Sequence, residues 1–251
     1  MTSNEHSPGT TESMARHTDN SQLDCPYRPD CDGCPLFEVP YEDQLERKRG
    51  IIRRAFDAYP ALEEVELAEV QGAERTIAYR NRARMMVTDV TSSDEKLGFF
   101  QSGTREVLPV GGCLVHHPTI EDVLAIVRAE LLDRPALDDF TRTVDVRSTA
   151  GHAPDGDVAI ATFSGHGEAE LLEDVRAEAR QMGERLRGGC DFEIGVHLNL
   201  ADEPDEGAIL GGRQETVTGP DHLEIEIADR LFDVPPSAFF QVNVDQLEAA
   251  H

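Results

Sequence analysis

The sequence predicts an α+β protein in which a cysteine-rich loop and one helix precede a mixed, mainly antiparallel sheet with flanking helices. Three cysteines fall within ten residues at the end of a polar tail, interleaved with Pro and Gly residues that favour a tight irregular loop. Apolar residues then recur at helical spacing in three segments and alternate with polar residues in several short ones. A chain of 251 residues is long enough to bury a core in one large domain or two small ones.

The composition is strongly acidic, with a formal net charge of -26 and only two lysines, Lys48 and Lys96. The carboxylates are spread along the chain, which favours a halophile-like, salt-adapted surface over an acidic tail that binds a partner. In about 1 M salt the Debye length falls to about 3 Å, so distant carboxylates repel a phosphate only weakly. The net charge therefore does not exclude a nucleic acid as a partner.

No apolar run reaches the roughly 20 residues that a membrane span needs, and the N-terminus lacks the pattern of a secretory signal. Residues 1–20 are polar and are expected to form a disordered tail. We therefore expect a cytoplasmic protein without a membrane partner, in a compartment that keeps thiols reduced.

The cysteines are the first candidate site. Cys25, Cys31 and Cys34 are spaced C-x5-C-x2-C, and Cys113 follows far downstream in a Gly-Gly-Cys-Leu segment. Thiolates gather where a metal ion or cluster neutralises their charge. A metal centre is therefore favoured over disulfides or chance, and the short C-x2-C arm suits zinc and iron–sulfur ligation equally.

A helix is predicted from Tyr41 up to Pro60, and with the cysteine loop it forms a predicted segment 21–58. Its non-apolar faces carry the most basic group of side chains in the chain: Arg47, Lys48, Arg49, Arg53 and Arg54. Two interpretations stay open for these faces, a solvated surface and a contact for an RNA backbone.

A strand is predicted at 79–87, where Arg80, Arg82 and Arg84 share one face because a strand has a period of two. Three arginines in register suit contacts to phosphates or bases, and the alternative is pairing with surface carboxylates. A shorter strand is predicted at 65–70, and a hairpin of strands 97–100 and 106–110 leads to Cys113.

The rest of a predicted central domain, 59–230, alternates helices and strands. They are expected at 121–132 (helix), 143–147 and 158–163 (strands), 168–186 (helix), 192–200 (strand), and 210–212 with 222–227 (hairpin). Cys190 has no thiol neighbour in the sequence and is expected to be structural or incidental. His197 is expected to be a polar residue satisfied within its strand.

The last stretch contains Phe239-Phe240-Gln241-Val242-Asn243. Adjacent aromatic rings and amides can hold a flat heterocycle, although an ordinary strand end would also fit. A helical start at 244–251 has no stop signal, so we expect the chain to be incomplete.

These motifs, in this order, resemble the iron–sulfur-containing RNA (uracil-5)-methyltransferase family, and the resemblance runs from Cys25 to the C-terminus. It implies formation of 5-methyluridine in rRNA or tRNA with S-adenosylmethionine. It implies that Cys25, Cys31, Cys34 and Cys113 hold a [4Fe–4S] cluster. It also places Phe239 in stacking near the flipped uridine, Gln241 in the cofactor and base pocket, and Arg82 near the cluster and RNA.

The departures from the family limit this expectation. The family's Rossmann-like methyl-transfer domain follows the Phe-x-Gln-Val-Asn element, so 231–251 is expected to be only its start. Its Gly-rich cofactor loop, nucleophilic Cys and general-base Glu are not found before His251. The S-adenosylmethionine site is therefore expected to be incomplete and this chain alone inactive. The alternative is a non-enzymatic metal- or cluster-containing RNA-binding module, acting in trans, with no DNA partner expected.

Overall fold

The computed structural model describes residues 23–89, 96–101, 103–104, 106–166, 171–201 and 213–250. They fall into two compact units, one of residues 37–76 and one that joins 23–36 to the chain from residue 77 onward. The predicted segment 21–58 is therefore divided, because the cysteine loop belongs to the unit of the sheet and the basic helix does not. The predicted tail 1–20 and the hairpin residues 210–212 lie outside the described residues.

The smaller unit consists of α1 (Tyr41–Asp57), a 3₁₀ turn (Pro60–Leu62) and an irregular return segment. The predicted helix is confirmed, but the predicted strand at 65–70 is wrong. Arg49 and Arg53 bind carbonyl oxygens of Leu67 and Val65, so side chains of α1 satisfy this backbone and no partner strand is needed. Two of the five basic side chains thus have a structural role.

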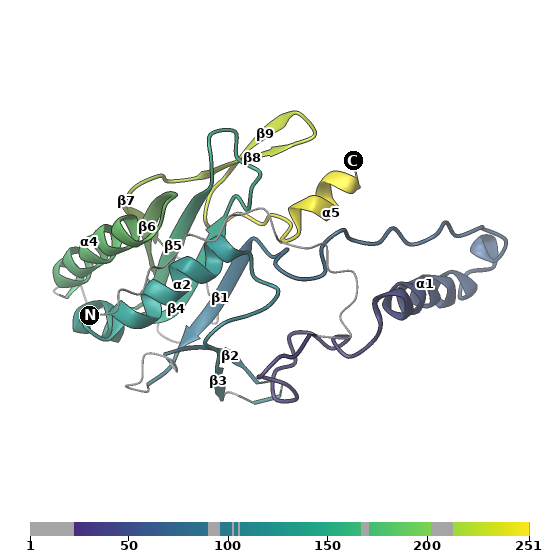
Figure 1. Ribbon diagram of the computed structural model, residues 1–251, viewed down its shortest axis with the longest axis horizontal. Coiled ribbons are helices and arrows are strands. Elements are labelled where there is room, and N and C mark those ends of the chain that lie inside the picture. Colours follow the sequence, from purple (N-terminus) through teal and green to yellow (C-terminus); the bar gives the residue numbers. More distant parts are fainter. Residues whose placement is uncertain are drawn as a thin grey trace, which may run out of the picture. The chain divides into compact units, whose positions relative to one another are not determined.

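The larger unit is built on a seven-stranded sheet with the order β3-β2-β1-β4-β5-β6-β7 (Figure 1). Its strands are β1 (Arg82–Val87), β2 (Leu97–Phe100), β3 (Val107–Pro109), β4 (Thr141–Ser148), β5 (Val158–Gly165), β6 (Glu193–Leu200) and β7 (Arg213–Thr218). Neighbours are antiparallel except β5 and β6, which run parallel and are joined by the crossover helix α4 (Leu172–Gly189). The predicted α+β class is confirmed.

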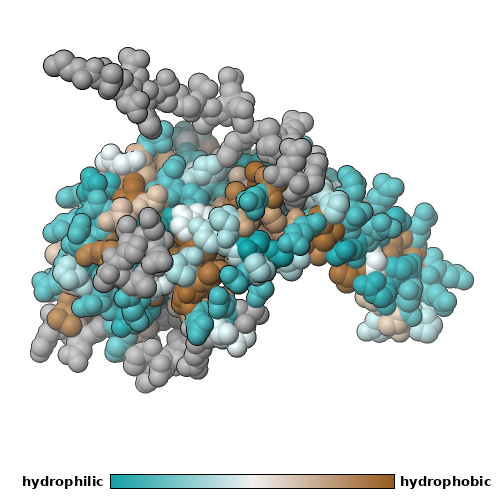
Figure 2. Space-filling view, turned by 60° about the horizontal axis from the view of Figure 1, so that its bottom comes forward, coloured by the Kyte–Doolittle hydropathy of each residue, from teal (hydrophilic) through white to brown (hydrophobic). Residues whose placement is uncertain are grey.

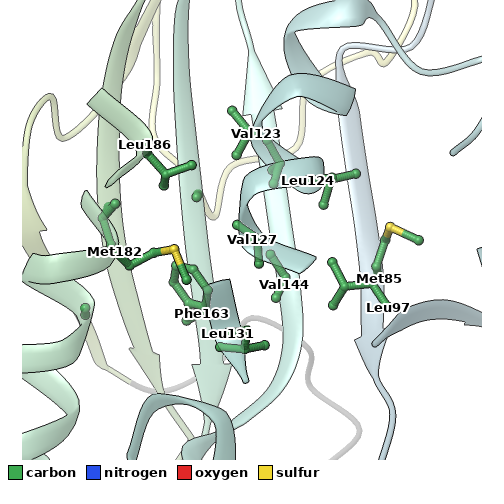
Figure 3. Packing of buried hydrophobic residues seen from close by; sticks show 14 of the residues in the cluster. Met85, Leu97, Val123, Leu124, Val127, Leu131, Val144, Phe163, Met182 and Leu186 are labelled. Carbon is green, nitrogen blue, oxygen red and sulfur yellow. The ribbon is translucent and has the colours of Figure 1, made fainter. Parts of the chain in front are cut away.

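Helices cover one face of this sheet and enclose the main core. Besides α4 they are α2 (Pro118–Leu131) and the short α3 (Pro135–Phe140), which was not predicted. In Figure 3, Val123, Leu124, Val127 and Leu131 of α2 point toward Val144 and Phe163 of the sheet. Every residue in this contact is fully buried, which identifies the apolar positions of the strands as the helix-facing set.

The opposite sheet face is polar over most of its width. Its side chains are Thr143, Asp145 and Arg147 of β4, Thr162 and Ser164 of β5, and His197 and Asn199 of β6. The prediction for His197 is confirmed, because its Nε2 lies 2.9 Å from the carbonyl oxygen of Pro220.

At one end of the polar face, the described residues form an apolar cluster. There Ile160 packs with residues of the hairpin β8 (Leu223–Ile227) and β9 (Arg230–Val234), and with Val244 of α5 (Val244–Ala249). The predicted domain boundary at residue 231 falls inside this hairpin, whose strands pair over their whole length.

The visible surface is mostly hydrophilic, with small hydrophobic patches (Figure 2), as the acidic composition leads one to expect. In the part of the chain that the structure describes, no helix is long and apolar enough to cross a membrane.

Candidate metal centre and the segments that meet at it

Cys25, Cys31 and Cys34 lie on one loop that is closed by hydrogen bonds between its own residues. The Cys31 amide donates to the Tyr27 carbonyl at 2.8 Å, and the Arg28 guanidinium donates to the Cys34 carbonyl at 3.4 Å. All five cysteines of the chain are half-buried, and none of them forms a disulfide in this structure. The loop therefore offers three thiols from ten residues.

The fourth cysteine, Cys113, follows the β2–β3 hairpin, which the sequence predicted and which leads the chain to the cysteine loop. After β3, the Gly111 amide donates to the Tyr27 hydroxyl at 2.7 Å and so ties the hairpin exit to the cysteine loop. Tyr27 and Cys113 both pack against the main core. On the other side, the Cys113 amide donates to the Glu121 carboxylate of α2 at 3.2 Å. Cys113 is thus held between the loop and the first turn of a helix.

The thiols influence one another electrostatically. Burial raises the pKa of Cys34, and the neighbouring Cys31 and Cys25 raise it further. Burial also raises the pKa of Cys113 to about 11, with Cys34 contributing. Several thiolates in a half-buried space disfavour their own ionisation unless a cation neutralises them, so the donor set fits a metal centre.

The identity of the metal is a separate question from the donor set. Cysteine thiolates are ligands of both zinc ions and iron–sulfur clusters, so these four thiols suit either.

Residues 79–81 join the cysteine centre to the C-terminal motif. Burial raises the pKa of Tyr79, and Cys34 and Cys113 raise it further, so this ring lies near both segments of the centre. The Arg80 amide donates to Val115, just after Cys113, and the Asn81 amide donates to Val242 at 2.9 Å. The three motifs that the resemblance connects in sequence therefore meet in space.

The predicted arginine face is only partly regular. Arg82 and Arg84 lie on β1 and share the carboxylate of Asp145 on β4, at 3.0 Å and 2.8 Å. Arg80 precedes the strand, is exposed, and donates through Nε to the Arg82 carbonyl. Asp145 is 1 % exposed, so the partner is one buried carboxylate and not the surface carboxylates considered as the alternative.

Arg147 is a site residue that sequence reasoning missed. Its side chain is 2 % exposed and donates to the carbonyl oxygens of Pro235 and Ala238, at 3.3 Å and 2.7 Å. Burial and the neighbouring Arg82 lower the pKa of Arg147 to about 10, so it remains charged at neutral pH. The sequence could have indicated this residue, because Asp145 and Arg147 are two positions apart and therefore place two charges on one face of the predicted strand.

The segment held by Arg147 contains the predicted aromatic site. Phe240 packs into the smaller apolar cluster and lies 6.2 Å from the ring of Phe232. Phe239 points the other way and is 83 % exposed, and Gln241 is also exposed. An aromatic ring that is exposed on an anchored segment is available for stacking.

Cys190 is separate from the centre. Burial raises its pKa to about 11, and its charged neighbours are Asp122 and Asp191 instead of other thiols. It lines a cleft of about 660 Å³ together with acidic residues that include Asp155 and Glu193. This cleft has the wrong charge for a phosphate, and the thiol is protonated at neutral pH.

Comparison with known proteins finds relatives that are named uncharacterized RNA methyltransferases. A scan against protein-family models finds no match. An uncharacterized RNA methyltransferase of Enterococcus faecalis is 24% identical over 256 residues, which cover 97% of this chain and 53% of the relative. Another, of Geobacter sulfurreducens, is 26% identical over 225 residues, or 89% of this chain and 44% of the relative.

A solved structure extends the likeness to the fold. Pyrococcus abyssi tRNA (uracil-54, C5)-methyltransferase, in complex with S-adenosyl-L-homocysteine, matches with a TM-score of 0.60 at 18% identity. The match covers 88% of this chain and 50% of that chain. The predicted resemblance to RNA methyltransferases is confirmed, and the chain spans about half the length of the curated relatives it matches.

Proposed function

We propose that this chain is the cluster-bearing, RNA-binding half of an S-adenosylmethionine-dependent RNA uridine C5-methyltransferase of the cytoplasm. The observation that carries the proposal is the convergence of Cys113, the cysteine loop and the 79–81 segment in one compact unit. The similarity to proteins named RNA methyltransferases over 89% or more of the chain supports the reaction class.

Cys25, Cys31, Cys34 and Cys113 would hold a [4Fe–4S] cluster, as the resemblance of the cysteine motif to the iron–sulfur-containing family implies. A cluster bound by the three loop cysteines and by Cys113 would fix the loop against the hairpin and α2. It would thereby also fix the positions of Tyr79 and Arg80. Its role in this chain is then to position the RNA-facing residues instead of transferring the methyl group.

Three kinds of side chain would contact the RNA. Arg80, Arg82 and Arg84 supply positive charge for phosphates. Phe239 supplies an exposed ring on which an extruded uridine can stack, which recovers part of the few kcal/mol that unstacking costs. Gln241 follows at the same surface and supplies an amide for the base or for S-adenosylmethionine, the methyl donor.

Methyl transfer itself needs a nucleophilic thiolate and a general base. Carbon 5 of uridine becomes nucleophilic only after a thiolate adds to carbon 6, and a base must then remove a proton. Four cysteines are assigned as ligands, and the pKa of the fifth, Cys190, is raised to about 11. We infer that both groups lie in the portion of the relatives that this chain does not span.

A second candidate function follows because four of the five cysteines are assigned as metal ligands and none as a nucleophile. If no further catalytic polypeptide works with this chain, it is a non-enzymatic, cluster-containing RNA-binding module.

The test is anaerobic purification, followed by iron, sulfide and zinc analysis and by binding of a labelled single-stranded RNA. Iron and sulfide in stoichiometric amounts, visible thiolate-to-iron absorption and RNA binding are expected. A colourless protein with one zinc per chain would overturn the assignment of a cluster. A protein that contains the cluster but does not bind RNA would overturn the RNA-binding role.

A further inference from the structure

Glu121, in the first turn of α2, contacts both ends of the short turn that carries the fourth cysteine. One carboxylate oxygen, Oε1, accepts a hydrogen bond from the Cys113 amide at 3.2 Å and lies 2.6 Å from Nδ1 of His116. The turn is also closed by its own backbone, because the His116 amide donates to the Cys113 carbonyl at 3.1 Å. A single carboxylate oxygen therefore spans the turn from Cys113 to His116.

The carboxylate is itself held by buried side chains. Its second oxygen, Oε2, lies 3.6 Å from Nη2 of Arg128, whose side chain is 7% exposed. Arg128 also donates to the sulfur of Met85 on β1 at 3.8 Å. The His116 ring is buried and packs edge-on against Phe99 of β2, with 6.0 Å between the ring centroids. Both oxygens are thus fixed relative to the core of the larger unit.

The charge of Glu121 is unfavourable at this position. A zinc ion or a cluster that is bound by four thiolates has a net negative charge, so a carboxylate beside one of the ligands is repelled. The positive end of the helix dipole favours an acidic residue in the first turn of α2, but it does not direct the side chain toward Cys113. The contact with the Cys113 turn therefore indicates a role in geometry.

The same turn is joined to the segment that precedes β1. The Arg80 amide donates to the Val115 carbonyl at 2.8 Å, and the His117 amide donates back to the Arg80 carbonyl at 2.9 Å. These two bonds link the turn that carries Cys113 to the backbone that carries Arg80. A group that fixes the turn therefore also fixes Arg80.

We infer that Glu121 is a positioning residue of the metal centre, which orients Cys113 for metal binding by fixing the turn that ends at His116. The inference rests on the proposed function for the presence of a metal, and it applies to zinc and to a cluster alike. Loss of an outer partner that orients a metal ligand costs about 10- to 100-fold in metal affinity. The three loop cysteines are held by bonds within their own loop, so the effect should begin at Cys113.

The test compares Glu121→Ala, which removes both contacts, with Glu121→Gln, whose side-chain oxygen can still accept hydrogen bonds. The full chain is purified anaerobically with its metal, and metal release to an excess of chelator is followed. Mass spectrometry records the order in which the cysteines react with iodoacetamide. Glu121→Ala should release metal about 10 to 100 times faster than the wild type, with Cys113 reacting before Cys31. Glu121→Gln should behave like the wild type in both measurements.

Glu130→Ala is the matched control on the same helix. The side chain of Glu130 is 19% exposed, against 25% for Glu121, and it accepts from Arg134 and Arg185 at 2.9 Å and 2.8 Å. This variant also loses the contacts of a carboxylate on α2, but it should release its metal at the wild-type rate. If Glu121→Ala does not fold, Glu121→Asp replaces it, because its charge remains while its shorter side chain cannot span both donors. Cys113 should again react first.

The outcomes separate this inference from the proposed function. If the wild type holds metal and Glu121→Ala releases it no faster, the inference is overturned and the metal centre stands. It is also overturned if Cys113 and Cys31 react together, or if Glu130→Ala releases metal equally fast, because either result assigns Glu121 to the general stability of α2. Equal release from Glu121→Gln and Glu121→Ala would overturn it in favour of a helix-dipole effect. A wild-type chain that binds neither iron nor zinc would overturn the metal centre and this inference together.

Discussion

The guanidinium of Arg147 on β4 donates a 2.7 Å hydrogen bond to the backbone carbonyl of Ala238, the residue before Phe239. A second bond reaches Pro235, so one buried side chain fixes both ends of a four-residue segment. The exposed Phe239 ring therefore lies on an anchored backbone, which would lower the entropy cost of the base stacking that we propose for it.

Replacing Arg147 with Met should release this segment. The two carbonyl oxygens lose their donors, and the free energy of unfolding should fall by about 1–3 kcal/mol. Hydrogen exchange across residues 235–243 should accelerate more than exchange in the sheet. Arg142→Met is the control, because Arg142 is exposed and its loss should change neither quantity. Equal exchange in both variants would contradict the anchoring role.

Replacing Cys31 with Ser should remove the metal and lower the melting temperature, whereas Cys190→Ser should do neither. Cys31 belongs to the group of thiols around Cys34, and Cys190 lies among carboxylates. Metal analysis and thermal unfolding under anaerobic conditions compare the two variants. If both lose metal, or neither does, the four-cysteine assignment is wrong.

Asp145→Asn should be the most destabilising single change on the polar face. Asp145 is buried and accepts from Arg82 and Arg84, and Arg147 lies beside them. Without the carboxylate, buried positive charge is left uncompensated, which costs about 3–5 kcal/mol. Denaturant unfolding should show this loss, and the exposed Asp139→Asn should stay near the wild-type value.

Asp157 should make stability depend on pH in the acid range. Burial alone would raise its pKa, but hydrogen bonds from the Gly151 amide, Thr149 and Thr119 lower it below the usual 3.8. A lowered folded-state pKa contributes stability above pH 3.8 that is lost as the pH falls through the folded value. Asp157→Asn should flatten the unfolding free energy against pH in that window. An unchanged slope would exclude this carboxylate as the cause.

Gly98→Ala should disrupt the hairpin that delivers Cys113. A Cβ atom at Gly98 would collide with the backbone carbonyl of Leu108 on the paired strand, so the strands must separate. We expect a loss of about 1–3 kcal/mol and weaker metal retention. Gly188→Ala in α4 is the control, since open space surrounds that position and helix propensity improves. Similar melting temperatures for the two variants would count against the close approach.

Local patterns predicted most elements of this fold. The helical spacing after Tyr41 and the alternation of apolar and polar residues in β4 and β6 were sufficient, because in each element the apolar positions share one face. The strand β7, with the sequence Arg-Gln-Glu-Thr-Val-Thr, was missed because an edge strand needs little apolar character. The strand predicted at 65–70 failed because Arg49 and Arg53 bind its carbonyls, a contact that alternation does not encode.

The sequence by itself predicted the cysteine loop and the aromatic element, because loop spacing and adjacent residues are local features that need no fold. Cys113, far from the loop in sequence, was added to the predicted ligands by the family resemblance. Only the tertiary structure decided which sheet face the helices cover, and therefore that Asp145, Arg147 and Thr162 are buried on the other one. Alternation shows that two faces differ, but the position of each face depends on contacts between distant strands and helices. The bond from Arg147 to Ala238 spans 91 positions, which no local pattern can predict.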